Sequence, residues 1–381
     1  MIYLDSHATT PVDPRVLDAM LPFFREHFGN ASSRNHPFGW KAAKAVEHAR
    51  EQVAELVGAR LRDIVFTSGA TESNNLAIKG VAGRAPRQKR GVVTLATEHR
   101  AVLDPCLALE RDGFRVTVLG VKPDGFVDLD ELSAAVTDDT ALVSVMAANN
   151  EIGVLQPLDA ISRIAKSHGA IFHCDAVQAA GISPLDVRKL GVDLASLSAH
   201  KMYGPKGVGA LYVAKNSPPI QLEPLLDGGG HERGYRSGTL NVPGIVGFGR
   251  AAEICRVEGP AEAARLAQLR DKLWAGLTAI GGVHANGSMT ERLPQNLNVR
   301  FDGVAGETLL ASLAGDVAIS SGAACATASA EPSHVLKALG LSDDQARASL
   351  RFGFHRFNTD QEVKLVVSMV CASVERLRST S

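Results

Sequence analysis

The chain lacks both a strong net charge and any long hydrophobic run. Its 381 residues include 40 Lys and Arg and 41 Asp and Glu, which gives a formal net charge of −1. Because a near-neutral surface attracts a phosphate backbone only weakly, we expect no direct nucleic-acid partner. No apolar run approaches the roughly 18 residues of a membrane span, and the first residues lack the basic and apolar regions of a signal peptide. We therefore expect a protein that does not associate with a membrane.

The cysteines lack any sign of pairing. They are odd in number and far apart, with no Cys-x-x-Cys pair and no zinc-ligand spacing: Cys106, Cys174, Cys255, Cys325 and Cys371. This pattern favours free thiols in a reducing compartment, so we expect a cytoplasmic protein with no metal site. Three of these cysteines lie in helix-like stretches and are expected to be small buried hydrophobes: Cys106, Cys255 and Cys371.

Cys325 differs from the other cysteines because every residue near it is small. The segment from Ser320 to Pro332 has neither a helical nor a strand period, so we expect a flexible loop. A thiol on such a loop can move, and in its thiolate form it is a nucleophile. Cys325 is therefore a candidate catalytic residue.

Short apolar runs alternate with helix-like stretches between about residues 60 and 215. Continuous apolar runs separated by helices, such as Leu158 to Ser167, predict a mainly parallel sheet covered on both faces, an α/β fold. The expected strands are 63–67, 91–96, 141–146, 170–174, 192–197 and 207–213.

A second, smaller domain is expected from the C-terminal part, which mixes helices with a few strands such as 295–300. The segment 256–262, which contains Gly-Pro, marks the predicted boundary. We expect a large α/β domain over residues 15–257 and a small α+β domain made of residues 1–14 and 258–381. The small domain would carry the Cys325 loop.

Polar segments follow five of the predicted strands. Because ligands of open α/β sheets bind beyond the carboxyl ends of the strands, these segments are expected to form one site for a polar, anionic, aromatic ligand. They are 68–72, 97–99, 149–151, 175–178 and 198–201.

Two of these strand ends suit pyridoxal 5'-phosphate (PLP). Lys201 can form an imine with the cofactor aldehyde, and Asp175 can pair with its protonated ring nitrogen. His99 can offer a flat face to the ring. The segment 68–73 opens a helix and can bind a phosphate with backbone N–H groups.

Each of these residues also has a structural interpretation. Asp175 could cap a helix, Lys201 could be a surface lysine and His99 a solvated loop residue. The 68–73 segment could be an ordinary helix start capped by Thr71 or Ser68. A dinucleotide site at 204–209 is disfavoured, because those glycines precede a strand and do not open a helix.

Several motifs together resemble those of the cysteine desulfurases of the IscS/NifS type, which are PLP enzymes of the class-V aminotransferase family. The resemblance runs from Tyr3 to about residue 360, nearly the whole chain. It implies fold type I, the aspartate-aminotransferase-like fold, with a mainly parallel seven-stranded sheet. The motifs are 3–5, 8–11, 66–75, 97–99, 149–153, 173–178, 196–201, 228–239, 320–325 and 349–353.

The resemblance implies a role for each matching residue. Lys201 would hold PLP as an imine, Asp175 would face the pyridinium nitrogen, and Gln178 would bond the phenolic oxygen. His99 would stack on the ring and assist proton transfer. The phosphate would be held by Ala70, Thr71, Ser198 and His200. Thr239 would reach the phosphate of a neighbouring subunit, which implies a homodimer.

The resemblance also implies the reaction. Asn150 and Arg351 would lie near the substrate carboxylate, which a guanidinium binds with two parallel hydrogen bonds. L-cysteine would become L-alanine, and its sulfur would pass to Cys325 as a persulfide. A protein acceptor, either an iron–sulfur scaffold or another sulfur carrier, would then receive the sulfur.

The chain departs from the family pattern at three places. Ala323 and Ala326 replace hydroxyl residues beside Cys325, and Ser6-His7 is less usual before Ala8. We also expect the longer C-terminal tail with which many housekeeping members bind their scaffold to be absent, which leaves the acceptor open. The alternatives are selenocysteine lysis or another PLP reaction, such as transamination, and a non-catalytic sulfur carrier or scaffold on the same fold.

Overall fold

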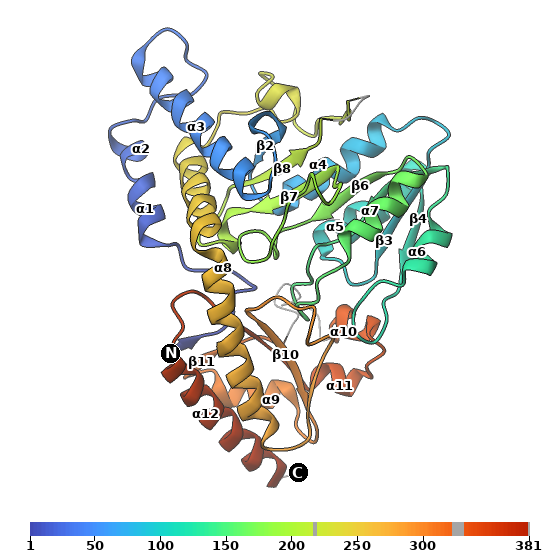
Figure 1. The fold of residues 1–381 in the computed structure, drawn as a ribbon, viewed down its shortest axis with the longest axis vertical. Helices are drawn as coiled ribbons and strands as arrows, with labels where there is room; N and C mark the ends of the chain where they lie inside the picture. The colour runs from blue at the N-terminus through green and yellow to red at the C-terminus, as the bar shows by residue number, and fades with distance from the viewer. Residues whose placement is uncertain (216–218, 322–330, 380–381) are drawn as a thin grey trace.

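The protein consists of a part built around a large sheet and a part that holds both chain termini (Figure 1). The structure is a computed structural model and describes residues 1–215, 219–321 and 331–379. Cys325, Ala323 and Ala326 lie outside the described residues. None of the helices within the described ranges combines the length and the apolar character that a membrane span requires.

The large sheet has seven strands and is mainly parallel. Strand β8 is antiparallel to both of its neighbours, and the other strands run in one direction. The order across the sheet is β2 (Ile64–Thr67), β8 (Gly209–Val213), β7 (Leu194–Ser198), β6 (Ile171–Asp175), β5 (Thr140–Ser144), β3 (Gly91–Leu95) and β4 (Arg115–Leu119).

The six apolar runs all form strands of this sheet, within two residues of the expected bounds. Apart from Ile171 at the start of β6, which is partly buried, their side chains are buried on both faces, which is why the runs are continuously apolar. Strand β4 was not predicted. It lies at the edge of the sheet, and each of its residues is exposed or partly exposed, so it has no buried apolar run to identify it.

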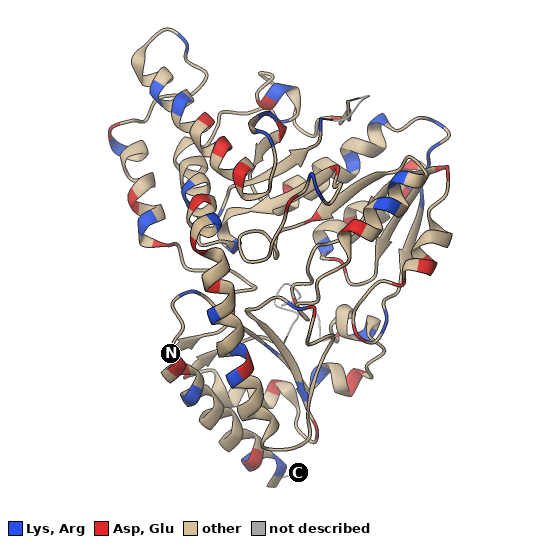
Figure 2. Cartoon of the chain, in the orientation of Figure 1, with Lys and Arg blue, Asp and Glu red and all other residues tan. Residues whose placement is uncertain are grey.

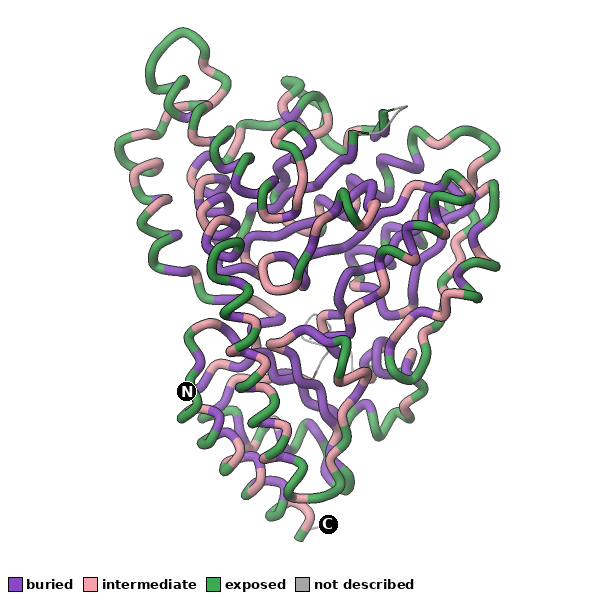
Figure 3. Tube along the Cα trace, in the orientation of Figure 1, coloured by how far each residue is buried: buried purple, intermediate pink, exposed green. Residues whose placement is uncertain are grey.

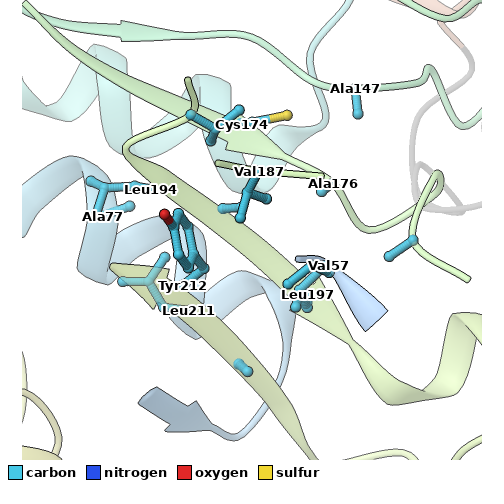
Figure 4. Packing of buried hydrophobic residues seen from close by; sticks show 14 of the residues in the cluster. Val57, Ala77, Ala147, Cys174, Ala176, Val187, Leu194, Leu197, Leu211 and Tyr212 are labelled. Carbon is cyan, nitrogen blue, oxygen red and sulfur yellow. The ribbon is translucent and has the colours of Figure 1, made fainter. Parts of the chain in front are cut away.

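Helices surround the sheet and supply the rest of its core (Figure 3). Helix α4 crosses β2 and β5 to β8, and α3 packs along α8. Figure 4 shows side chains of this core, among them Val187, Leu197 and Tyr212. The helices are α1 (Pro14–Met20), α2 (Pro22–Arg25), α3 (Pro37–Leu56), α4 (Ala70–Arg84), α5 (Arg100–Ala108), α6 (Leu129–Ala135), α7 (Leu158–Ser167) and α8 (Val242–Thr278).

A second hydrophobic core lies in the part that holds the termini. An antiparallel sheet is formed by β12 (Ser349–Gly353), β10 (Asn296–Phe301) and β9 (Val283–Ala285), and β1 (Ile2–Tyr3) pairs in parallel with β11 (Val317–Ala318). The helices here are α9 (Gly306–Leu313), α10 (His334–Ala338), α11 (Asp343–Arg347) and α12 (Asp360–Ser379).

Helix α8 joins the two cores without a break. It continues through segment 256–262, where a linker-like sequence suggested a boundary, and Pro260 lies inside it. Before this segment Ile254 and Cys255 pack in the first core, and after it Leu266 and Leu269 pack in the second. The division at 257/258 stays a prediction, which this change of packing partners supports.

Arg356 bonds groups from distant segments where the two parts meet. Its side chain is 8% exposed and forms ion pairs with Asp13 (2.7 Å) and Glu262 (2.9 Å). The guanidinium carbon lies 3.8 Å from the centre of the Tyr203 ring, and the Tyr203 hydroxyl donates to Glu262. Elsewhere basic and acidic residues are interspersed along helices such as α8 (Figure 2).

Replacing Arg356 should therefore destabilise the protein strongly. In Arg356→Met the buried carboxylates lose a cationic partner, and we expect the free energy of unfolding to fall by about 3 kcal/mol. Urea denaturation measures this change. Arg163→Met, which removes an exposed pair with Asp159, is the control and should cost less than about 1 kcal/mol. Equal effects of the two substitutions would contradict the role of Arg356.

Candidate active site

A cavity of about 960 Å³ lies at the carboxyl ends of the parallel strands. Each of the five predicted strand-end segments contributes residues to its wall, and segment 97–99 contributes one, His99. The predicted site residues on its wall are Ala70, Thr71, His99, Asn150, Asp175, Gln178, Ser198, His200, Lys201 and Arg351. The structure therefore brings together residues that are up to 281 positions apart in the sequence, from Ala70 to Arg351.

The start of helix α4 is open toward an anion. Its N-cap is Gly69, and no side chain caps the first turn, so the interpretation of Thr71 or Ser68 as cap is wrong. Gly69 has φ 153°, and a Cβ on Gly209 would come within 2.7 Å of its Cα, so glycine is required on both sides of this approach. The N–H groups of Ala70 and Thr71, in the first turn, have no partner within the helix and suit a phosphate.

Glu72 limits which N–H groups that phosphate can use. Its carboxylate accepts from the Ser68 N–H (2.8 Å) and from Arg236 Nε (2.8 Å). Although burial opposes ionisation, these bonds lower the pKa of Glu72, so it stays charged. The Ser68 N–H is thus engaged, whereas the N–H groups of Ala70 and Thr71 are not.

Asp175 ends β6 and is oriented as a hydrogen-bond acceptor. It is 7% exposed, and it accepts from Asn74 Nδ2 (2.8 Å) and from the Val177 N–H (3.1 Å). The chain after it forms turns, so Asp175 caps no helix. A buried carboxylate of this kind needs a cationic partner, which a protonated ring nitrogen in the cavity would provide.

Lys201 follows β7 and is half-buried on the cavity wall, so it is not a surface lysine. Its amine donates to the backbone oxygens of His7 and Ala8. His200 Nδ1 lies 3.1 Å from Thr9 Oγ1, and burial, aided by Lys201, lowers the pKa of His200 to about 4. His200 is therefore neutral near pH 7 and can donate or accept a hydrogen bond at the phosphate.

His99 is the N-cap of α5 and lines the cavity. Its Nδ1 accepts from the Ala101 N–H (3.0 Å), so the neutral ring carries its proton on Nε2. A ring in this tautomer can pass the Nε2 proton to a neighbouring atom. The interpretation of His99 as a solvated loop residue is wrong, because it is partly buried at the start of a helix.

Arg351 lies on β12 at the other side of the cavity and is 1% exposed. Its Nη2 pairs with Asp5 Oδ1 (2.7 Å), and its Nη1 donates to the backbone oxygen of Asn150 (2.9 Å). These bonds orient the guanidinium beside Asn150, the arrangement that a carboxylate site requires.

Two predicted residues are not placed on this wall. Thr239 is exposed and does not line the cavity of its own chain. Cys325 lies outside the described residues, and the described chain on either side of it reaches the site. Ser320 bridges to Arg351, and Ser333 lines the cavity.

Two buried glutamates near the cavity belong to the predicted segments 97–99 and 149–151, but the sequence assigns neither of them a role. Glu98 is buried, accepts from the Met146 N–H (2.7 Å), and has a pKa raised well above its usual value by burial. Glu151 accepts from the Ser333 hydroxyl (2.5 Å), and burial raises its pKa to about 7. Each glutamate is adjacent in sequence to a predicted site residue, His99 or Asn150, but nothing in the sequence shows that it is buried.

Comparisons with known proteins agree with this geometry. The aminotransferase class-V family matches residues 2–366. The cysteine desulfurase IscS of Anaeromyxobacter sp. (strain Fw109-5) is 58% identical over all of this chain and 94% of that protein. The chain belongs to the class-V aminotransferases. It is similar in structure to a NifS-like protein, at 41% identity and a TM-score of 0.91 over 98% of this chain and 99% of that one. The structure of SspA in complex with cysteine is also similar, at 37% identity and a TM-score of 0.83 over 94% and 100% of the two chains.

This family membership confirms the expected fold and PLP as the cofactor. The residues of the cavity fit the group. The start of α4 offers N–H donors without partners in the helix, Asp175 is a buried acceptor, and Lys201 is an amine on the same wall. The cavity is of the size usual for small-molecule sites.

The raised pKa of Glu151 predicts a stability that depends on pH. Between the usual pKa of 4.5 and about 7, the folded state keeps a proton that the unfolded state loses, so stability falls as the pH rises through this window. Glu151→Gln cannot ionise and should be more stable than the wild type at pH 8 by about 1–3 kcal/mol, with no difference at pH 5. Urea denaturation at both pH values tests this. The exposed Glu291→Gln is the control, and an equal gain at pH 5 would contradict the prediction.

Proposed function

We propose that the protein is a cysteine desulfurase that takes sulfur from L-cysteine onto Cys325. The observation that carries the proposal is the meeting of Lys201, Asp175 and Arg351 at one cavity, in a chain 58% identical to a protein named cysteine desulfurase IscS. The similar SspA structure is described in complex with cysteine, which supports L-cysteine as the substrate.

The residues of the cavity divide the work of this reaction. PLP, when bound, supplies an electron sink for negative charge on the substrate. Lys201 holds the cofactor and moves a proton at the substrate Cα, and His99 exchanges a proton through Nε2. Arg351 and Asn150 bind the substrate carboxylate. Cys325, as a thiolate, attacks the substrate sulfur, so that an S–S bond forms, the C–S bond breaks, and alanine leaves after protonation.

We further propose that the enzyme is a cytoplasmic homodimer. Thr239 is exposed and lies away from the cavity of its own chain, as expected for a residue that contacts the phosphate of a neighbouring subunit. The persulfide on Cys325 would pass to a protein acceptor, either an iron–sulfur scaffold or another sulfur carrier. The name IscS of the relatives favours the former.

Lys201→Ala should abolish the visible absorbance of the purified, PLP-loaded protein, because the substitution removes the amine that would form the imine with the aldehyde. Lys206→Ala removes a second lysine of the cavity wall and is the matched control. It should keep the absorbance. A visible band of unchanged intensity in Lys201→Ala, resistant to dialysis, would disprove the role of Lys201.

Cys325→Ala should keep the visible absorbance and lose sulfide release from L-cysteine by ~10³-fold or more. The half-buried thiol of α12 provides the control, and Cys371→Ala should release sulfide at the wild-type rate. Alanine and sulfide are measured together. Full activity in Cys325→Ala would rule out Cys325 as the sulfur acceptor, and wild-type turnover of selenocysteine but not cysteine would favour the selenocysteine lyase alternative.

A further inference from the structure

His7 is a buried imidazole in the cavity wall whose function is not explained by the reaction above. It is 3% exposed, and its ring lies between Gln178, which follows β6, and Asn296, on β10. Two glycines make room for this contact. A Cβ on Gly353 would come within 2.7 Å of the His7 ring, and one on Gly153 within 2.5 Å of the Asn296 amide.

The orientation of the Asn296 amide is determined by two neighbouring groups, one that can only donate a hydrogen bond and one that can only accept. Arg292 Nη1 can only donate, and it lies 3.3 Å from Asn296 Oδ1. The backbone oxygen of Glu151 can only accept, and Asn296 Nδ2 lies 3.0 Å from it. The second N–H of Asn296 must therefore be the donor in its 3.1 Å contact with His7 Nε2.

This contact in turn determines the tautomer of His7. Since Nε2 accepts, the ring proton is on Nδ1, which donates to Gln178 Oε1 (2.8 Å). Gln178 Nε2 donates to the backbone oxygen of His7 (3.2 Å), in agreement with the same amide orientation. The other N–H of Gln178 has no acceptor among the described residues, and Gln178 lines the cavity.

His7 also stays neutral over the working range of pH. Burial lowers its pKa to about 3, and the charges of Arg351, Lys201 and Arg292, which face it from β12, the β7 end and the segment before β10, act in the same direction. The hydrogen bond with Gln178 opposes these effects but is weaker. Protonation of the ring therefore does not reverse the bonds near neutral pH.

We propose that His7 is a positioning residue that holds the amide nitrogen of Gln178 toward the cavity, with Arg292 setting this polarity through Asn296. The inference rests on the proposed function, because Gln178 would face the anionic ring oxygen of bound PLP, as the resemblance to the cysteine desulfurases implies. An amide held the other way would place its own oxygen against that negative charge. The negative charge of the cofactor is least compensated in its high-pH form. An N–H donor therefore stabilises this form more than the low-pH form. It therefore lowers the pH at which the visible absorbance titrates.

His7→Leu removes the donor to Gln178, so the apparent pKa of the visible band should rise by about 0.5–1. His7→Asn places an N–H close to the position of Nδ1 and should restore most of the wild-type value. Asn296→Asp can only accept from His7, which reverses the tautomer and the Gln178 amide, and it should raise the apparent pKa more than His7→Leu does.

Asn298→Asp is the matched control for the added charge. Asn298 lies on the same strand and donates to the same Glu151 oxygen (3.2 Å), but it has no bond with His7. It should shift the band much less than Asn296→Asp. Equal shifts from the two substitutions, or no shift in His7→Leu, would overturn the proposal.

A measurement on the wild-type protein avoids variants that do not fold. Nitrogen NMR of protein labelled with ¹⁵N-histidine, assigned with His7→Asn, should show His7 protonated on Nδ1 alone from pH 6 to 8, with or without PLP. A ring protonated on Nε2, or one that titrates in this range, would refute the proposal. A wild-type protein without a visible band would instead refute the proposed function, and the polarity inferred for His7 toward PLP with it.

Discussion

The hydrogen bonds of the N-terminal segment, residues 5–10, join the two parts of the molecule at the cavity. On one side Thr10 donates its N–H to the oxygen of His200 (3.0 Å), and Lys201 donates to Ala8. On the other side Ser6 donates to the oxygen of Gly353 (3.2 Å). This short stretch of backbone therefore sets the position of the Lys201 amine, which follows β7, relative to the Arg351 guanidinium on β12.

Burial determines the charge states around this segment. The raised pKa values of Glu98 and Glu151 and the lowered values of His7 and His200 all have desolvation as their largest cause. Neutral forms are thereby favoured on the cavity wall, while Asp5 compensates the charge of Arg351. The fixed dipoles of these buried neutral groups suit the stabilisation of a charge that develops on a bound ligand.

Much of the site could be predicted because its residues follow strands that the sequence itself identifies. The buried strands β2, β3 and β5 to β8 are continuous apolar runs, and the carboxyl ends of all of them except the antiparallel β8 meet at one edge. The edge strand β4 and the uninterrupted helix α8 could not be predicted in the same way. Partial exposure removed the apolar signal from β4, and packing on two cores keeps α8 helical through a Gly-Pro sequence that is typical of a break.

The sequence by itself determined the fold class, the sheet strands and the polar residues that follow them, because hydrophobic periodicity and strand ends are local properties. Only the tertiary structure decided that His7 contacts Gln178 and Asn296, which are 171 and 289 positions away. It also decided which glutamates are buried and that Gly69 leaves the start of α4 uncapped. Proton positions and pKa values depend on desolvation and on hydrogen-bond partners from distant segments, and no local pattern in the sequence encodes these.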